Sequence, residues 1–573
     1  MTDAEQPAGQ PSEKRPIWVL LTPAGRSPRV LLLAALTGLL TGAAVAAFDQ
    51  TTGTVLLGRI QRAPLAVQAL GPLCGLLLAA AVLKWVGGGA SPATADDYVR
   101  NFHTHDQRLS LRAAPAKVLA AVATLGAGTP LGYEGPSIYM GAIIGSGLQR
   151  RMSSVFSRRD AKVLLVAGAA AGVAAIFKAP ATGAIFALEV PYQDDLARNM
   201  LLPALVGAAM GYVTFAALVT TTSPLLAIKG APPFDLRDLG GALVIGILAG
   251  IGARAFAALI RAAKRLSARL NPFVGAAGAG IILGALIVAG RAISDQPLAI
   301  GPGYQAIRWA TDPTHGVLLV AGLLLIRTLA VPVALAGGGV GGLFIPLVVE
   351  GALVGRLCGS AFGQPGSSLF PVIGIAAFLG AGYRVPLAAL MFVAESTGRP
   401  EFVVPGLIAA VAAQLLMGRA SVSAYQQARQ AGHLERRFQL PLADVVRTDI
   451  ATLAPTATVA DLFNHLRVGP RRSSVAVVDQ GRYVGMARLD DMQDLAQDQW
   501  ADTTVAEIMR TDVAAASPSW TFRQALAAME RADVDELAVV DGDRLTGIVS
   551  SSDILRLHDL FEQATEDGRD LGV

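Results

Sequence analysis

The sequence predicts an all-α polytopic membrane domain, built from two inverted-topology repeats with broken helices, followed by a cytoplasmic α/β domain. Composition is the first observation: 53% of the 573 residues are hydrophobic and 16% are charged, whereas charged residues make up about 25% of a typical soluble domain. The second is a series of apolar runs of the roughly twenty residues that span a bilayer, including 30–48, 241–260 and 317–335. The third is the return of charged residues after residue 430.

We expect six segments along the chain. They are a cytoplasmic N-terminal segment (1–27), a transmembrane domain (28–430, with halves of about 28–225 and 226–430), a linker (431–445), two α/β units (446–500 and 501–565) and a tail (566–573). The N-terminal segment is polar and lacks the apolar core of a signal peptide, so we expect the first helix to be retained.

Basic residues gather between the predicted spans, for example in 149–162 and 261–269. By the positive-inside bias, these segments and both termini face the cytoplasm. The short loops are typical of a bacterial protein, so we expect an integral protein of the bacterial inner or plasma membrane. Cys74 and Cys358 lie in apolar runs and indicate neither a disulfide nor a metal framework.

The membrane part contains an internal repeat, which appears when residues at a fixed offset are compared. At an offset of 210 the matches are Lys117 with Arg327, Gly128 with Gly338, Gly132 with Gly342, Pro136 with Pro346, Gly141 with Gly351 and Gly145 with Gly355. At an offset of 206, "FKAPATGAIFALE" (177–189) matches "YRVPLAALMFVAE" (383–395). Transporters built from inverted repeats place their site where the halves meet, at broken helices near the bilayer midplane.

Two glycine–proline segments of the repeat, Gly132-Tyr-Glu-Gly-Pro136 and Gly342-Leu-Phe-Ile-Pro346, are typical of helix starts. Glycine permits a tight entry, and proline suits the first turn, where its missing N–H is not needed. Gly88-Gly89-Ala-Ser91-Pro92 has the same character. Three helix N-termini at one place would offer unpaired N–H groups, each end carrying roughly +0.5 charge. Such an arrangement binds an anion without a formal cation, and weakly enough for conduction.

The soluble part is predicted to contain two similar units, each with a helical stretch followed by a strand, a tight turn, a second strand and another helix. The segments from the first strand to the last helix are 473–495 and 536–557, and the second contains Gly547-Ile-Val-Ser550-Ser-Ser-Asp553. This repeat resembles a pair of CBS domains. The resemblance implies that an adenine nucleotide binds between the copies, with Ser550 and Asp553 contacting the ribose. The first copy has Arg488 in place of the hydroxyl, so a dimerisation and trafficking module without a ligand is the alternative.

Together, the glycine–proline segments, the inverted halves and the CBS pair resemble the CLC family of chloride channels and chloride/proton antiporters. The resemblance implies a homodimer with one pathway per subunit for chloride or another small monovalent anion. It makes Glu134 the gate: the ionised carboxylate occupies an anion site, and the protonated side chain moves away. The anion-binding residues that it implies are Gly88, Gly89, Ser91, Gly132, Gly135, Phe344, Ile345 and Tyr425, with Phe344 and Ile345 contributing backbone N–H groups.

The sequence departs from the family pattern around the anion. Tyr133 stands where arginine is usual, which changes the outer electrostatics. Gly89 lacks the hydroxyl that contacts the central anion in relatives, and a one-residue shift would bring Ser91 closer, so the preference for chloride over nitrate stays open. Tyr425 is the candidate for the tyrosine hydroxyl at the inner end, with an interfacial tyrosine on the last membrane helix as the alternative.

Proton coupling is the second open question. Val190 stands where many exchangers carry an inner glutamate, as in the channel branch, although some exchangers lack this glutamate. For Glu189 we favour buried hydrogen bonding over proton relay. For the basic pair Lys117 and Arg327, snorkelling or helix-end charges and a positive potential along the pathway are equal alternatives.

Other functional classes are disfavoured. An intramembrane zinc protease needs His-Glu-x-x-His, which does not occur among the six histidines, so we predict no enzyme and no metal site. A CBS-containing cation transporter would need rings of acidic residues and is a remote alternative. We expect no required cofactor and no nucleic-acid partner. The prediction is chloride/proton exchange gated by Glu134, with a voltage- or pH-gated chloride channel as the alternative.

Overall fold

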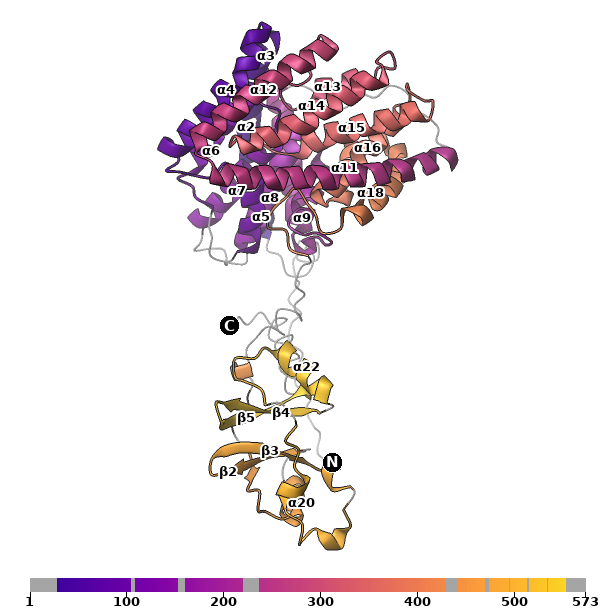
Figure 1. Ribbon diagram of the computed structural model, residues 1–573. Helices are drawn as coiled ribbons and strands as arrows, with labels where there is room; N and C mark the ends of the chain where they lie inside the picture. The colour runs from indigo at the N-terminus through magenta and orange to yellow at the C-terminus, as the bar shows by residue number, and fades with distance from the viewer. Residues whose placement is uncertain are drawn as a thin grey trace, which may run out of the picture. The chain divides into compact units, whose positions relative to one another are not determined.

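The computed structural model describes residues 28–104, 109–152, 160–219 and 236–428, and 442–552 except 445, 447, 449, 469–473, 494, 513–514 and 533. The chain divides into two compact units, Met1–Gln430 and Ala431–Val573. Each unit is described by itself (Figure 1).

The regular elements in the described part of the first unit are helices, and eight of its described helical segments are long and apolar enough to cross a membrane. Helix α11 (Leu236–Arg269) packs against the shorter α18 (Val403–Met417) (Figure 1). Its helices are α2 (Pro28–Asp49), η1 (Gln50–Leu57), α3 (Gly58–Arg62), α4 (Leu65–Ala81), η2 (Val82–Val86), α5 (Ala95–His103), α6 (Ala114–Gly126), α7 (Glu134–Arg151), α8 (Asp160–Phe177), α9 (Pro180–Glu189), η3 (Arg198–Met200), α10 (Leu201–Val219), α11 (Leu236–Arg269), α12 (Pro272–Ser294), α13 (Tyr304–Ala310), α14 (Val317–Ala336), α15 (Phe344–Ala361), α16 (Leu369–Tyr383), α17 (Pro386–Thr397), η4 (Pro400–Phe402) and α18 (Val403–Met417).

The internal repeat is visible in the backbone. Gly132 and Gly342 pair as an isolated antiparallel bridge. The N–H of Gly132 donates to the carbonyl of Gly342 at 2.9 Å, and the N–H of Gly342 donates back at 2.8 Å. Because each glycine pairs with its own counterpart in the repeat, the two halves meet about a local two-fold axis at this bridge.

Unusual backbone conformations recur at matching positions in the two halves. Gly128 and Gly338 have φ of 90° and 75°. Lys178 and Arg384 have φ of 56° and 58°, in the left-handed region that side chains with a Cβ rarely adopt. Four matching residues in this rare region confirm that the repeat is structural.

Equivalent glycines also allow the closest helix crossings. A Cβ placed on Gly141 of α7 would lie 1.9 Å from the carbonyl oxygen of Gly168 on α8. In the second half, a Cβ on Gly351 of α15 would lie 2.3 Å from the carbonyl oxygen of Gly374 on α16. Small residues are what permit such close backbone approach between membrane helices.

Two glutamates, one in each half, form a second link between the halves. Each accepts hydrogen bonds from the first N–H groups of the helix that carries the other. Glu189, at the end of α9, accepts the N–H groups of Leu387 (3.2 Å) and Ala388 (2.9 Å) at the start of α17. Glu395, near the end of α17, accepts the N–H groups of Ala181 (2.9 Å) and Thr182 (2.7 Å) at the start of α9. The predicted role of Glu189 in buried hydrogen bonding is confirmed, and each pair satisfies N–H groups that have no partner within their own helix.

The second unit contains one five-stranded sheet with the order β1-β2-β3-β5-β4. Its elements are η5 (Leu442–Asp444), β1 (Thr452–Leu453), α20 (Val459–Val468), β2 (Ser474–Asp479), β3 (Arg482–Arg488), η6 (Asp490–Met492), η7 (Gln497–Gln499), α21 (Val505–Ile508), α22 (Phe522–Ala532), β4 (Glu536–Asp541) and β5 (Arg544–Ser550). The β2–β3 and β4–β5 hairpins share one register, with Ser474 opposite Arg488 and Glu536 opposite Ser550. Each copy has its own apolar core, so the predicted duplication is confirmed.

The crossing of α7 and α8 generates a stability prediction. Gly141→Ala should lower the free energy of unfolding by about 1–3 kcal/mol, because the added methyl group must push two backbones apart. Thermal unfolding of the detergent-purified protein measures this loss. Gly147→Ala in the same helix is the control, since a Cβ there meets Leu111 at an ordinary 3.6 Å; equal losses for both variants would contradict the close-crossing explanation.

The reciprocal caps generate a second prediction. Glu395→Gln should cost about 1–3 kcal/mol of stability, because the amide places an NH₂ group against N–H donors that need an acceptor. Glu401→Gln, at an exposed position in η4, should leave the unfolding temperature unchanged. A Glu395→Gln protein as stable as the wild type would show that this cap does not contribute to the free energy of unfolding.

Candidate functional site

The starts of α7 and α15 face each other at the centre of the first unit. The bridge between Gly132 and Gly342 lies two residues before each helix begins, at Glu134 and Phe344. Both helices have a proline in the first turn, as the sequence predicted. The unpaired N–H groups and partial positive charges of two helix N-termini are therefore held together in a buried region.

Glu134 lies between these two helix starts. It is fully buried, and its Oε1 accepts the backbone N–H of Phe344. Its Oε2 is buried without a hydrogen-bond partner among the described residues. The structure thus brings the carboxylate of one half onto the helix start of the other half, where a free anion would find its donors.

Glycine at positions 132 and 342 is what makes room for this carboxylate. A Cβ on Gly132 would lie 1.9 Å from Oε2 of Glu134, and a Cβ on Gly342 would lie 2.1 Å from Oε1. Any other residue at either position would displace the side chain of Glu134. Gly135 is also tightly enclosed, since a Cβ there would lie 2.6 Å from the hydroxyl oxygen of Thr94.

Aromatic rings enclose the start of α15. The ring of Phe344 lies 4.4 Å from that of Phe177, 5.0 Å from that of Phe392 and 5.4 Å from that of Phe186, measured between centroids. Phe344 and Ile345 are both fully buried. The rings therefore form a dry, apolar cluster around the first side chain of α15, whose backbone N–H contacts Glu134.

A cavity of about 500 Å³ lies beside the paired helix starts and reaches Gly342 and Leu343. Its polar and charged lining includes Ser91, Thr94, Asp96, Asp97, Arg100, Lys264, Arg265, Tyr383 and Tyr425. Asp96 is paired with Lys264 at 2.5 Å, and Asp97 is paired with Arg100 at 2.7 Å and with Lys117. The lining therefore holds two carboxylates and three basic side chains, so basic charge is in excess.

The predicted helix start at Gly88–Pro92 is wrong by several residues, because α5 begins at Ala95. Gly88 and Gly89 have φ of 60° and 81° and form the turn that ends the preceding helix, where left-handed glycine is common. Gly89 lines a separate cavity of about 270 Å³. Ser91 is exposed and lines the larger cavity. Glycines in this segment thus end one helix rather than begin the next.

Two tyrosines line the larger cavity. Tyr425 is 55% exposed, lies in a turn after α18 rather than on a membrane helix, and has the Arg100 guanidinium 5.7 Å from its ring centre. Tyr383 is 2% exposed, and its hydroxyl accepts the N–H of Leu343 at 3.4 Å. Tyr383 and Thr94 were missed from the sequence; Tyr383 matches Phe177 in the repeat and therefore reads as a core residue.

The repeated basic residues are buried and anchor neighbouring segments. Lys117 donates to the carbonyl of Ala93 at 2.7 Å and to the carboxylate of Asp97. Arg327 donates to the carbonyls of Gly301 (2.9 Å) and Pro302 (2.6 Å). Snorkelling is therefore wrong for both side chains, since each is at most 4% exposed.

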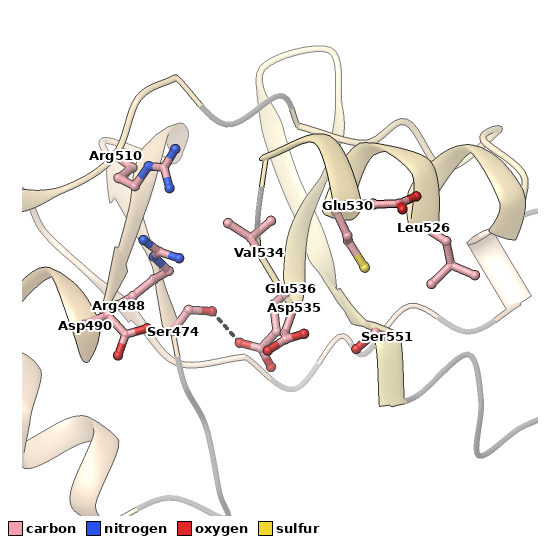
Figure 2. A pocket seen from close by; sticks show the side chains of 11 residues that line it. Ser474, Arg488, Asp490, Arg510, Leu526, Glu530, Val534, Asp535, Glu536 and Ser551 are labelled. Carbon is pink, nitrogen blue, oxygen red and sulfur yellow. Dashed lines mark hydrogen bonds between the residues drawn. The ribbon is translucent and has the colours of Figure 1, made fainter.

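The second unit has a cavity of about 570 Å³ between its two repeated copies (Figure 2). The first copy contributes Ser474, Arg488 and Asp490, and the second contributes residues of α22 and the start of β4. Ser474 donates to the carboxylate of Glu536, its counterpart in the repeat (Figure 2). Ser550 is buried and is not among the residues that line this cavity, whereas its neighbour Ser551 is; Asp553 lies outside the described residues.

The chain is similar to known families and proteins along most of its length. The family model described as "Voltage gated chloride channel" matches residues 74–418, more than half of the chain, and the CBS domain model matches 442–497 and 505–559. A protein named H(+)/Cl(-) exchange transporter ClcA from Cronobacter sakazakii is 29% identical over 415 residues, which are 68% of this chain and 86% of that protein. ClcA from Salmonella typhi is 27% identical over 419 residues, or 68% and 85%.

Solved structures share the fold. A slow cyanobacterial Cl⁻/H⁺ antiporter has a TM-score of 0.61 and 22% identity, covering 69% of this chain and 96% of that one. A CLC-type fluoride/proton antiporter has a TM-score of 0.62 and 23% identity, covering 70% and 98%. A eukaryotic CLC transporter has a TM-score of 0.58 and 19% identity, covering 94% and 99%. With the paired helix starts, the repeat and the family match in agreement, the chain belongs to the CLC family of voltage gated chloride channels and carries a pair of CBS domains.

Proposed function

We propose that this protein exchanges chloride for protons across a membrane, with Glu134 as the gate. The observation that carries the proposal is the contact between the Glu134 carboxylate and the N–H of Phe344 at the start of α15. The relatives named as H(+)/Cl(-) exchange transporters support the direction of the proposal.

Competition between two anions explains the gate. The ionised carboxylate is attracted to the helix N-termini by their partial positive charge and by the hydrogen bond from Phe344. A chloride ion needs the same donors, among which we include the N–H groups of Phe344 and Ile345 and the glycine-flanked start of α7. Protonation removes the charge that holds the side chain, so the donors become available to chloride. Proton occupancy and anion occupancy are thereby coupled.

Glu134 is also poised to leave. Burying a carboxylate is costly unless its oxygens are paired, and one of the two oxygens is unpaired among the described residues. The bound carboxylate is therefore held firmly enough to compete with chloride but is not locked in place. Conduction requires this kind of moderate binding.

A chloride channel without proton coupling is the second candidate. Val190 favours it, because this residue is 2% exposed and carries no titratable group at the end of α9. Exchange then requires another inner route for the proton. The two candidates differ in one measurable quantity, which is proton movement against a gradient.

We propose a homodimer in a bacterial inner or plasma membrane, with both termini in the cytoplasm. The basic segments between spans support this orientation through the positive-inside bias. Membership of the CLC family supports the membrane location.

We further propose that the cavity between the CBS copies binds an adenine nucleotide. Arg488 and Arg510 line it and would suit phosphate groups, since guanidinium binds phosphate in a bidentate manner. Asp535 and Glu536 offer acceptors for ribose hydroxyls, with Ser550 and Asp553 as the further ribose contacts. Leu526 and Met529 also line the cavity and offer an apolar surface for the base.

The gate is tested with the full chain in liposomes under a chloride gradient, while a pH electrode follows protons. The wild type should drive protons uphill, and chloride flux should rise as the pH falls, because protonated Glu134 releases the helix starts. Glu134→Gln should carry chloride without proton movement and without pH dependence, because glutamine cannot take up a proton.

Glu401→Gln, at an exposed position in η4, is the control and should keep proton movement. Wild-type chloride flux without proton movement would overturn exchange in favour of the channel. Retained pH dependence in Glu134→Gln would remove Glu134 from the gate.

The nucleotide site is tested by isothermal titration of the full chain with ATP and AMP. Arg510→Ala should weaken binding at least about tenfold, because a charged hydrogen bond contributes about 1.5–3 kcal/mol. Arg482→Ala is the control, since Arg482 is exposed on β3 and pairs with Asp543 outside the cavity. An absence of heat with the wild type would favour a module without a ligand.

A further inference from the structure

The cavity of about 270 Å³ lies where four of the apolar spans begin or end. Leu65–Val86, Leu236–Arg269 and Val317–Ala336 end beside it, and Pro272–Ser294 begins there. The basic segment 261–269 belongs to the same end of the first unit. The cavity therefore lies where helices leave the hydrocarbon, at the level of the lipid headgroups.

The lining of this cavity is apolar apart from three side chains. Lys84, Ser267 and Asn271 are polar, and the other residues that line it are apolar or glycine. Pro92 and Ser267 line both this cavity and the larger one of about 500 Å³, so an occupant of the smaller cavity lies beside the larger. An occupant that suits this lining is largely hydrocarbon and carries a polar or charged group.

Lys84 is the one charged side chain of this lining. It is exposed, and among the described residues its ammonium has no carboxylate within ion-pair distance and no hydrogen-bond acceptor. The ammonium instead lies 5.2 Å from the centre of the Phe273 ring. A positive charge without an acidic partner in the described part of the chain is complementary to an anionic group.

Exposed apolar side chains surround the same place. Trp85 is 72% exposed, and its ring lies 5.7 Å from that of Phe273 between centroids. Val86 and Val274 are 63% and 65% exposed. Tryptophan is enriched at the headgroup level of a bilayer, and lysine reaches the headgroups from the end of a span. This surface is therefore typical of one that faces lipid at the edge of the membrane.

We propose that this cavity binds an anionic phospholipid, with the phosphate at Lys84 and Asn271 and part of one acyl chain inside the cavity. The phosphate supplies the negative charge that Lys84 lacks. Among the described residues, the side chain of Asn271 uses only its oxygen, which accepts the N–H of Phe273 at 3.0 Å, so its NH₂ group can donate to the phosphate. The apolar lining receives the hydrocarbon chain.

The same residues favour an anionic headgroup over a zwitterionic one. The cationic group of a phosphatidylcholine would lie close to Lys84, and no carboxylate lines this cavity to receive it. Phosphatidylglycerol carries the phosphate without that second charge. This inference does not rest on the proposed function, because it concerns only the lipid that borders the spans.

Trp85 serves as the reporter in the test. The full chain is placed in phosphatidylcholine vesicles that contain a small fraction of a lipid with brominated acyl chains, since bromine quenches tryptophan fluorescence on contact. Trp85→Phe identifies the part of the signal that comes from Trp85. Brominated phosphatidylglycerol should quench this part at about fivefold lower fraction than brominated phosphatidylcholine, the factor that one basic side chain contributes near an anionic lipid.

Variants separate the cavity from general surface charge. Lys84→Gln should remove the preference for phosphatidylglycerol, and Lys84→Arg should keep it because the charge remains. Ala336→Leu should remove the preference too, since the larger side chain fills the space for the acyl chain. Arg151→Gln is the matched control: it removes one positive charge at an exposed position at the end of α7, outside the cavity, and should keep the preference.

Three results would each overturn the proposal. They are equal quenching by the two lipids in the wild type, a preference that survives in Lys84→Gln, and an equal loss of preference in Arg151→Gln. Thermal unfolding identifies variants that fail to fold; if Ala336→Leu is one of them, the comparison of Lys84→Gln with Lys84→Arg decides.

Discussion

The site depends on two backbone hydrogen bonds between Gly132 and Gly342. They hold the starts of α7 and α15 face to face, where the partial positive charges of the two helices would otherwise repel each other. The negative charge of Glu134 offsets this repulsion. A helix pair held in this way needs an anion at its centre, and either the protein's own carboxylate or a solute can supply it.

The same bridge explains why glycine recurs around the site. Gly132 and Gly342 leave space for Glu134, and Gly135 leaves space for Thr94. Further along α7 and α15, glycines allow α8 and α16 to cross at backbone contact. The paired starts and the close crossings therefore form one closely packed frame around the carboxylate of Glu134.

Much of this frame could be predicted from the sequence, because glycine, proline and glutamate act on the backbone locally. The repeat, the starts of α7 and α15 and the position of Glu134 all follow from such residues. The glycines at 87–89 were less informative, since the same composition begins a helix or ends one; only their positive φ values show that Gly88 and Gly89 end η2. Thr94 and Tyr383 come to line the cavity through tertiary contacts, and no local pattern distinguishes a hydroxyl that lines a cavity from one in the core.

In the CBS pair, the repeat is kept in the backbone but not in the side chains that line the cavity. Its two hairpins have the same register, yet the matched positions carry different side chains: Ser474 against Glu536, and Arg488 against Ser550. Both copies line one cavity, but with different side chains: Arg488, Arg510 and Asp490 lie on one side, and Glu530, Asp535 and Glu536 on the other (Figure 2). The cavity is therefore asymmetric in charge although the backbone is repeated.

The reciprocal caps of α9 and α17 restrict how this protein can vary in length. Each helix carries, at or near its end, the glutamate that caps the start of the other helix. The length of each helix therefore sets where its glutamate meets the other. Inserting one residue into α9 would turn Glu189 by about 100° around the helix axis and move it about 1.5 Å along it. The start of α17 would lose its acceptor, while α9 would keep its own. We therefore expect insertions and deletions to be tolerated in the connecting loops and not within these two helices.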